Sequence, residues 1–249
     1  MPTSSARPPD PTSVAAWSGA VEAGARGWYS AAFTGARALR SDPDPVVRSL
    51  AASLEGSLLR QLGRHDAASV RDGLALRESG FGRGALQPRA VDAVVDALVG
   101  LAADAIGPRR TSRADVLLAR AEDVLTEHPG HSRVWLRVWW VRAEVAMARG
   151  DGPSALSAAS RAVDASQAFA SDRHRIKSRL VLCAARLVAG DHGAAAVDAR
   201  SVRVDAEALG LLPLAWAASS ISEALGETGA ATVRGVLEVA IRSRGGVFS

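Results

Sequence analysis

Residues 132–166 read SRVWLRVWWVRAEVAMARGDGPSALSAASRAVDAS, and this stretch decides the fold. In both halves, apolar or small residues recur at steps of three and four, which is the period of an amphipathic helix. Gly150 ends the first half, where a C-terminal cap takes a positive φ. Pro153 begins the second half, where its missing N–H costs nothing. The stretch therefore predicts two antiparallel helices joined by a tight turn.

Six positions of this hairpin have counterparts at the same offsets elsewhere in the chain. Small residues at the second, fifth and sixth positions let two helices approach closely, and the fourth position is a turn glycine. The three sets are Trp139, Ala143, Ala146, Gly150, Ala155 and Ala162; Ala52, Gly56, Leu59, Gly63, Ala68 and Ala75; and, with poorer chemistry, Arg179, Cys183, Arg186, Gly190, Ala195 and Val202.

The glycines that close amphipathic stretches lie 44, 43, 40 and 36 residues apart, from Gly63 through Gly107, Gly150 and Gly190 to Gly226. A period of this length indicates stacked helical hairpins. We therefore expect an extended, all-α solenoid of about six antiparallel hairpins. Its twelve or so helices are expected near 13–25, 28–41, 45–62, 65–78, 89–106, 111–128, 132–149, 153–170, 172–189, 192–209, 213–226 and 228–243.

The repeated positions resemble the tetratricopeptide repeat (TPR), a helix hairpin of about 34 residues. That family has a bulky residue, a small residue, a larger apolar residue, a turn glycine and two alanines at this spacing. The match is good for 46–76 and 132–166, fair for 172–205 and weak for 210–243. The region 89–129 departs from the pattern, because additional residues lengthen its turn.

The resemblance implies a right-handed α-solenoid whose inner groove binds a protein or peptide. It places a TPR-like repeat domain at 13–243, between a disordered leader at 1–12 and a C-terminal tail at 244–249. The prolines of the leader remove backbone donors and oppose helix formation.

Composition narrows the class of protein. The 249 residues include 30 basic and 26 acidic side chains, so the net charge is only +4 and a nucleic-acid partner is not favoured. The single cysteine, Cys183, excludes an intrachain disulfide and a cysteine-cluster metal site. The N-terminus lacks the apolar core of a signal peptide, and no apolar stretch reaches the ~18 residues that span a bilayer. We expect a soluble, cytoplasmic protein without a membrane segment.

No stretch carries a recognisable catalytic, cofactor or metal motif. The glycine-rich segment 79–84 has no preceding strand, so it predicts a flexible loop rather than a phosphate loop. His128 and His131 flank a turn, but no carboxylate or thiol at ligand spacing completes a metal site. Cys183 lies on an apolar helical stripe, which predicts a buried, inert thiol. We therefore expect no enzymatic activity, no cofactor and no metal.

The helix expected at 132–149 carries three of the six tryptophans, interleaved with arginines. Trp139 matches the bulky repeat position and is expected to be buried between repeats. Trp140 lies one step around the helix, toward the expected groove. If the family geometry holds, Arg137 and Lys177 occupy equivalent groove positions in neighbouring repeats. The alternative is a buried tryptophan core with solvated arginine edges.

Five residues make up the expected partner groove, a mixed basic and aromatic surface: Arg60, Arg137, Trp140, Glu144 and Lys177. The leading hypothesis is a non-enzymatic interaction module, an adaptor or scaffold that binds a protein or peptide. The alternative is a regulatory protein that senses a small molecule or peptide and acts on a transcription regulator. The sequence leaves a homo-oligomer open.

Overall fold

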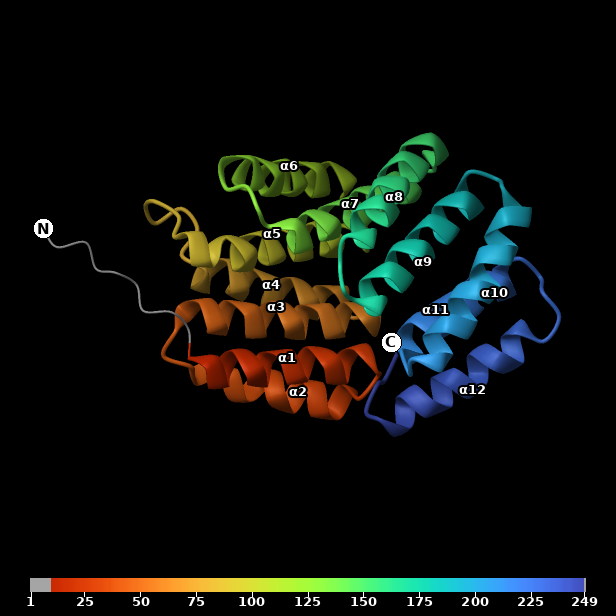
Figure 1. Cartoon of the computed structure of the whole chain (residues 1–249), viewed down its shortest axis with the longest axis horizontal. Helices are drawn as coiled ribbons and strands as arrows, with labels where there is room; N and C mark the ends of the chain where they lie inside the picture. The colour runs from red at the N-terminus through yellow and green to blue at the C-terminus, as the bar shows by residue number, and fades with distance from the viewer. Residues whose placement is uncertain (1–9, 249) are drawn as a thin grey trace, which may run out of the picture.

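The computed structural model describes residues 10–248, which form twelve α-helices and no strand (Figure 1). Two short 3₁₀ turns, Leu39–Ser41 and Pro88–Ala90, lie between helices. The predicted all-α class is confirmed, and each expected helix has a counterpart whose ends differ by less than one turn. The helices are α1 (Pro11–Ala25), α2 (Tyr29–Ala38), α3 (Pro45–Gln61), α4 (His65–Glu78), α5 (Val91–Ile106), α6 (Thr111–Glu127), α7 (Ser132–Ala148), α8 (Gly152–Gln167), α9 (Asp172–Val188), α10 (His192–Ala208), α11 (Leu212–Ala224) and α12 (Ala230–Ser243).

The turn between α7 and α8 follows directly from its sequence. Gly150 has a φ of 74°, and the next N–H, that of Asp151, donates to the carbonyl of Ala146 at 3.0 Å. The Asp151 side chain then caps α8 by accepting from the N–H of Ser154 at 3.0 Å. The turn between α9 and α10 repeats this arrangement. Local chemistry therefore ends one helix and begins the next within four residues.

The helices form an inner and an outer layer. Successive odd-numbered helices pack on one another from α1 to α11, and each even-numbered helix packs on the odd-numbered helices next to it in sequence. The middle inner helix, α5, is buried on nearly every side, which its run of Val, Ala and Leu permits. Its valines and leucine form the largest apolar cluster together with α6 and α7.

At the repeat positions, alanines lie where helices contact each other, and glycines lie where the chain turns. Gly63 and Gly190 have φ values of 81° and 84° at hairpin turns. The alanines at repeat positions have no exposed surface, so neighbouring helix backbones approach closely over them. These alanines are Ala68, Ala143, Ala155 and Ala195.

Trp139 differs from its expected burial, because its ring is half-buried rather than enclosed between repeats. Its ring stacks on the Trp135 ring, with 5.7 Å between the centroids. The Arg161 guanidinium of α8 lies over the Trp139 ring, 4.9 Å from its centroid. Alanines of α7 and α8 pack against each other, so the two helices approach closely and leave no space for an indole between them. The indole therefore lies at the edge of the hairpin.

The helical-repeat solenoid is confirmed, but it is not extended as expected, because its two ends contact each other. The last hairpin, α11–α12, returns to the end of the first one, as Figure 1 shows. Tyr29 of α2 and Ile241 of α12 share one apolar cluster. The Arg244 guanidinium donates to the carbonyl of Arg26 at 2.9 Å and lies over the ring of Trp28 at 4.3 Å. Each terminal hairpin thus covers apolar surface that an open stack would expose.

The first described residues depart from the predicted leader. Helix α1 begins at Pro11, and the Asp10 side chain caps it by accepting from the N–H of Thr12 at 2.9 Å. The predicted boundary at residue 12 is therefore wrong, because an aspartate followed by proline is a helix start rather than a break. Residues 1–9 of the expected leader lie outside the described residues.

The predicted C-terminal tail at 244–249 is part of the fold as far as residue 248. The carbonyl of Arg244 accepts from the N–H of Ser30 at 3.0 Å. Phe248 stacks on Trp216 of α11, with 4.6 Å between ring centroids. Across residues 10–248, none of the helices combines the length and apolar character that a membrane crossing requires.

Gly150→Ala should destabilise the protein by about 1–2 kcal/mol, because alanine disfavours a positive φ. A Cβ at Gly150 meets open space, so the cost comes from the backbone alone. Gly73 of α4 also has open space but no positive φ, and Gly73→Ala should stabilise by about 0.5–1 kcal/mol. Urea denaturation measures both; equal effects of the two variants would contradict the capping geometry.

Phe248→Ala should lower the free energy of unfolding by about 1–3 kcal/mol, because it removes a half-buried ring that stacks on α11. The neighbouring Val247 is 61% exposed, so Val247→Ala is the matched control and should have an effect within about 0.5 kcal/mol. Thermal melts and urea titrations of both variants check this. If Phe248→Ala is as harmless as its control, the tail does not hold the closed arrangement.

Candidate functional site

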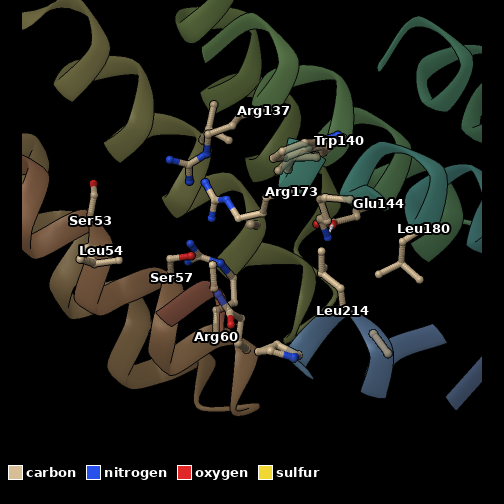
Figure 2. Close-up of a pocket in the computed structure, with 18 of the residues that line it drawn as sticks. Ser53, Leu54, Ser57, Arg60, Arg137, Trp140, Glu144, Arg173, Leu180 and Leu214 are labelled. Atoms are coloured by element: carbon tan, nitrogen blue, oxygen red, sulfur yellow. Dashed lines mark hydrogen bonds and ion pairs between the residues drawn. The ribbon is translucent and has the colours of Figure 1, made fainter. Parts of the chain in front are cut away.

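Closure of the helix stack leaves a central cavity of about 680 Å³. Side chains from all six inner helices line it, and Tyr29, His65 and Phe248 complete the lining. Cavities of roughly 300–1,000 Å³ with mostly apolar walls are typical of small-molecule sites. The cavity is therefore the candidate site, and Figure 2 shows part of its lining.

The five residues expected to form a partner groove all line this cavity. Trp140 donates from its indole N–H to the Ser178 hydroxyl at 2.9 Å, which fixes the ring against α9. Lys177 lies 3.3 Å from the Glu144 carboxylate and 5.9 Å from the Trp140 ring. Trp140, Lys177 and Glu144 thus form one connected patch between α7 and α9 on the wall of the cavity.

Arg137 faces the cavity from α7, but a carboxylate already holds one of its nitrogens. It pairs with Asp96, a buried residue of α5, and Arg133 pairs with the same carboxylate at 2.8 Å. The pKa of Asp96 is lowered: burial raises it, but the two guanidiniums more than offset that effect. Arg137 therefore retains free N–H groups while its charge is largely compensated.

Arg60 turns its guanidinium away from solvent into a buried cluster between α3, α4 and α5. It pairs with Asp72 at 2.7 Å and with Asp104 at 2.5 Å, and it donates to the carbonyl of Gly100 at 3.2 Å. A Cβ at Gly56 would lie 2.6 Å from the Asp72 carboxylate, so this repeat glycine makes room for the acid as well as for the helix. Arg60 thus connects its own inner helix α3 to the outer helix α4 and the inner helix α5.

Two carboxylates share the single Arg60 cation, and the protonation of Asp72 is affected. Burial raises the pKa of Asp72 to about 7, against the opposing effect of Arg60. One oxygen of Asp72 and one of Asp104 are buried without a hydrogen-bond partner in the described part of the chain. A proton on Asp72 makes the cluster neutral, which is the favoured state of a buried group.

Arg173 differs from the other cavity cations. It makes no ion pair and no hydrogen bond within residues 10–248, although it lines the cavity from the first turn of α9 and lies beside Arg137 (Figure 2). Burial lowers the pKa of Arg173, and Arg137 and Arg133 lower it further. A cation in the first turn of a helix also opposes the helix dipole. Every interaction of this side chain with its own helix end and with the nearby arginines is therefore unfavourable.

Arg173 belongs to a run of basic residues at 173–179 but is not among the residues expected to form the groove. Its neighbours in that group have partners: Arg175 pairs with Asp172 and donates to the Phe169 carbonyl, and Arg179 pairs with Asp205. The one available signal was position, because Arg173 lies four residues before Lys177 on the same helix face.

The rest of the cavity is mostly apolar, with isolated hydroxyls. The Ser57 hydroxyl on α3 makes no hydrogen bond within the described residues, and the Ser53 hydroxyl, one turn earlier, is buried without a partner. Figure 2 places both serines on the wall formed by α3. The apolar lining comes from both ends of the chain and includes Trp17, Val21, Leu54, Leu180, Leu214, Trp216 and Phe248.

His174 lines the cavity and contacts a serine hydroxyl through its imidazole. Its Nδ1 lies 2.7 Å from the Ser171 Oγ, and its ring stacks between Trp140 and Phe169. Burial, followed by the charge of Arg173, lowers the pKa of His174 to about 4. The imidazole is thus a neutral, weak base at pH 7 and an unsuitable partner for activating a nucleophile.

The other candidate residues of the sequence lie outside this cavity. Cys183 is fully buried and donates to the Ala195 carbonyl at 3.2 Å, and burial raises the pKa of its thiol to about 12. His131 contacts Asp92 at 2.6 Å. Among the described residues, no group of three or more His, Cys, Asp or Glu side chains is placed to hold a metal ion. Segment 79–84 forms turns with three positive-φ glycines.

Comparisons with known proteins add no assignment: neither a model of a protein family nor a curated protein sequence matches this chain. The resemblance to the TPR family therefore stays a prediction from the repeat positions. The helical-repeat architecture itself is shown by the packing of neighbouring helices in sequence order.

The raised pKa of Asp72 predicts that stability decreases as the pH rises from about 4 to about 7. The folded protein holds this proton more tightly than the unfolded chain, so its contribution is complete at low pH and is lost above pH 7. In Asp72→Asn, the decrease in the free energy of unfolding between about pH 4 and about pH 7 should be smaller than in the wild type by more than about 1 kcal/mol. Urea denaturation at several pH values measures the effect.

Asp123 provides the matched control, because it is exposed on α6 and makes no ion pair within residues 10–248. Asp123→Asn should leave the pH profile unchanged. Identical profiles for the wild type and Asp72→Asn would show that the pKa of Asp72 in the folded protein is an ordinary one.

Proposed function

We propose that this protein binds a small molecule in its central cavity and acts as a non-enzymatic sensor. The single observation that carries the proposal is the closed arrangement of the hairpins, which turns the inner faces of a repeat stack into a cavity of about 680 Å³. This volume lies in the range of small ligands. A folded partner requires a larger and more open surface, on the order of 800 Å² on each side.

The chemistry of the lining supports binding rather than catalysis. The cations near the wall are mostly held by carboxylates, the histidine beside a serine is a weak base, and the thiol is buried. These groups give the cavity charge and polar contacts, but they do not pair a nucleophile with an activating base. The sequence alternative of a ligand-sensing protein is therefore favoured over an adaptor that grips a protein in an open groove.

A ligand in this cavity touches both ends of the chain. Trp17 belongs to α1, whereas Trp216 and Phe248 belong to α11 and the segment after α12. A molecule that contacts both ends stabilises the closed arrangement relative to any opened one, which is the requirement for a ligand-dependent shape change. We propose that the outer surface reports this change to a protein partner, such as a transcription regulator. Membership of the TPR family and a cytoplasmic location belong to the same proposal.

The test uses the neutral, apolar fluorophore N-phenyl-1-naphthylamine as a probe of the cavity. Its fluorescence should rise with saturation at about one site per chain, because the cavity excludes water from it. Ser57→Trp places a large ring in the cavity and should weaken binding at least about tenfold. The matched control is Ser160→Trp on the outer helix α8, where Ser160 is exposed.

Ser160→Trp should bind the probe like the wild type. Circular dichroism and melting temperature establish that both variants are folded. Absence of saturable binding to the wild type, or equal binding by the two folded variants, would contradict the proposed use of the cavity.

A further inference from the structure

The charges around the cavity are compensated in every case but one. Arg60 shares two carboxylates, Arg137 has Asp96, and Lys177 has Glu144. Arg173 has no carboxylate partner among residues 10–248. One positive charge on the cavity wall, that of Arg173, therefore has no negative partner in the described part of the chain.

The side chains around Arg173 do not supply that charge. On α7, Arg137 and Arg133 repel it, and on α5 the carboxylate of Asp96 is already shared by these two arginines. Glu22 of α1 attracts it at longer range but is ion-paired with Arg26 at 2.6 Å. His174 of the same helix is neutral near pH 7. Arg173 is half-buried, and a partly desolvated charge without a partner costs stability, so its retention indicates a partner from outside the chain.

We infer that the ligand is an amphipathic monocarboxylate whose carboxylate pairs with Arg173 while its apolar body lies against the aromatic and aliphatic wall of the cavity. This inference rests on the proposed function and adds the ligand's chemical class to it. One unpaired guanidinium matches one negative charge, and its planar fork fits the two oxygens of a carboxylate.

The surroundings of the carboxylate site supply further donors. Arg137 keeps free N–H groups beside Arg173, and Ser57 on the opposite wall has an unpartnered hydroxyl (Figure 2). A dianion such as a phosphate monoester requires a second free cation, which the described lining does not offer. The apolar residues Trp17, Leu54, Leu214, Trp216 and Phe248 suit an aliphatic or aromatic body.

The experiment compares 11-(dansylamino)undecanoic acid with its methyl ester, which differs in the loss of the negative charge. The acid should bind the wild type about 10- to 100-fold more tightly, as expected for charge-assisted hydrogen bonds to a carboxylate. Arg173→Met should make the two affinities equal, and Arg173→Lys should restore part of the preference. Arg120→Met is the matched control, because Arg120 is exposed on α6 and unpaired within residues 10–248.

A second measurement does not depend on any probe. Arg173→Met removes an uncompensated cation, so the melting temperature of the free protein should rise by about 2–4 °C, whereas Arg120→Met should leave it unchanged. A lower melting temperature for Arg173→Met would overturn the inference, because it would show that the protein itself stabilises this arginine.

The remaining outcomes separate the inference from the proposed function. Equal binding of acid and ester by the wild type, with both lost in Ser57→Trp, overturns the carboxylate assignment but leaves the cavity as a ligand site. Binding of neither probe overturns both. Displacement of the bound acid by decyl phosphate more readily than by decanoate also overturns the assignment, because it favours a dianion.

Discussion

The contact between the first and the last hairpin is the constraint on which the rest of this structure depends. Tyr29 and Ile241 pack together across it, and Gly246 lies so close to both that a Cβ there would meet the Tyr29 ring at 2.7 Å. Without this contact, the inner faces of the odd-numbered helices form an open curved surface. With it, they surround a cavity of about 680 Å³ that charged and polar side chains line together with apolar ones.

Helix α5 organises the charges around that volume. Its acidic residues Asp92 and Asp96 lie one turn apart on the side of α7, whereas Asp104, two turns later, lies on the side of α3. Each meets an arginine or histidine from another helix: Arg133 and His131 at the first, Arg133 and Arg137 at the second, and Arg60 at the third. A helix that is otherwise apolar thus carries the counterions for its neighbours. The position opposite Arg173 has no such residue.

In the proposed function, binding in this cavity is coupled to the shape of the whole molecule. Its walls come from helices that are distant in sequence and joined by noncovalent contacts, so a ligand that bridges them favours one curvature of the stack over others. Repeat proteins suit this role, because each hairpin contacts mainly its neighbours and small rotations add along the chain. In the proposed function, the half-buried cation of Arg173 lowers the stability of the free protein, and an external anion removes that cost.

The helices, the hairpin turns and the side chains of the inner face could be predicted from the sequence, because they follow from local periodicity, capping residues and positive-φ glycines such as Gly150. The closure of the stack could not be predicted in this way, because the curvature is the sum of many small packing angles between helices. No single residue specifies that sum. For the same reason Phe248 reads as a tail residue in the sequence but lies in the cavity wall. Only the tertiary structure decided that Trp139 lies at a hairpin edge and that Arg173, unlike Arg60 and Arg137, has no carboxylate within reach. A side chain's partners come from other helices, and their distances exist only once the helices are packed.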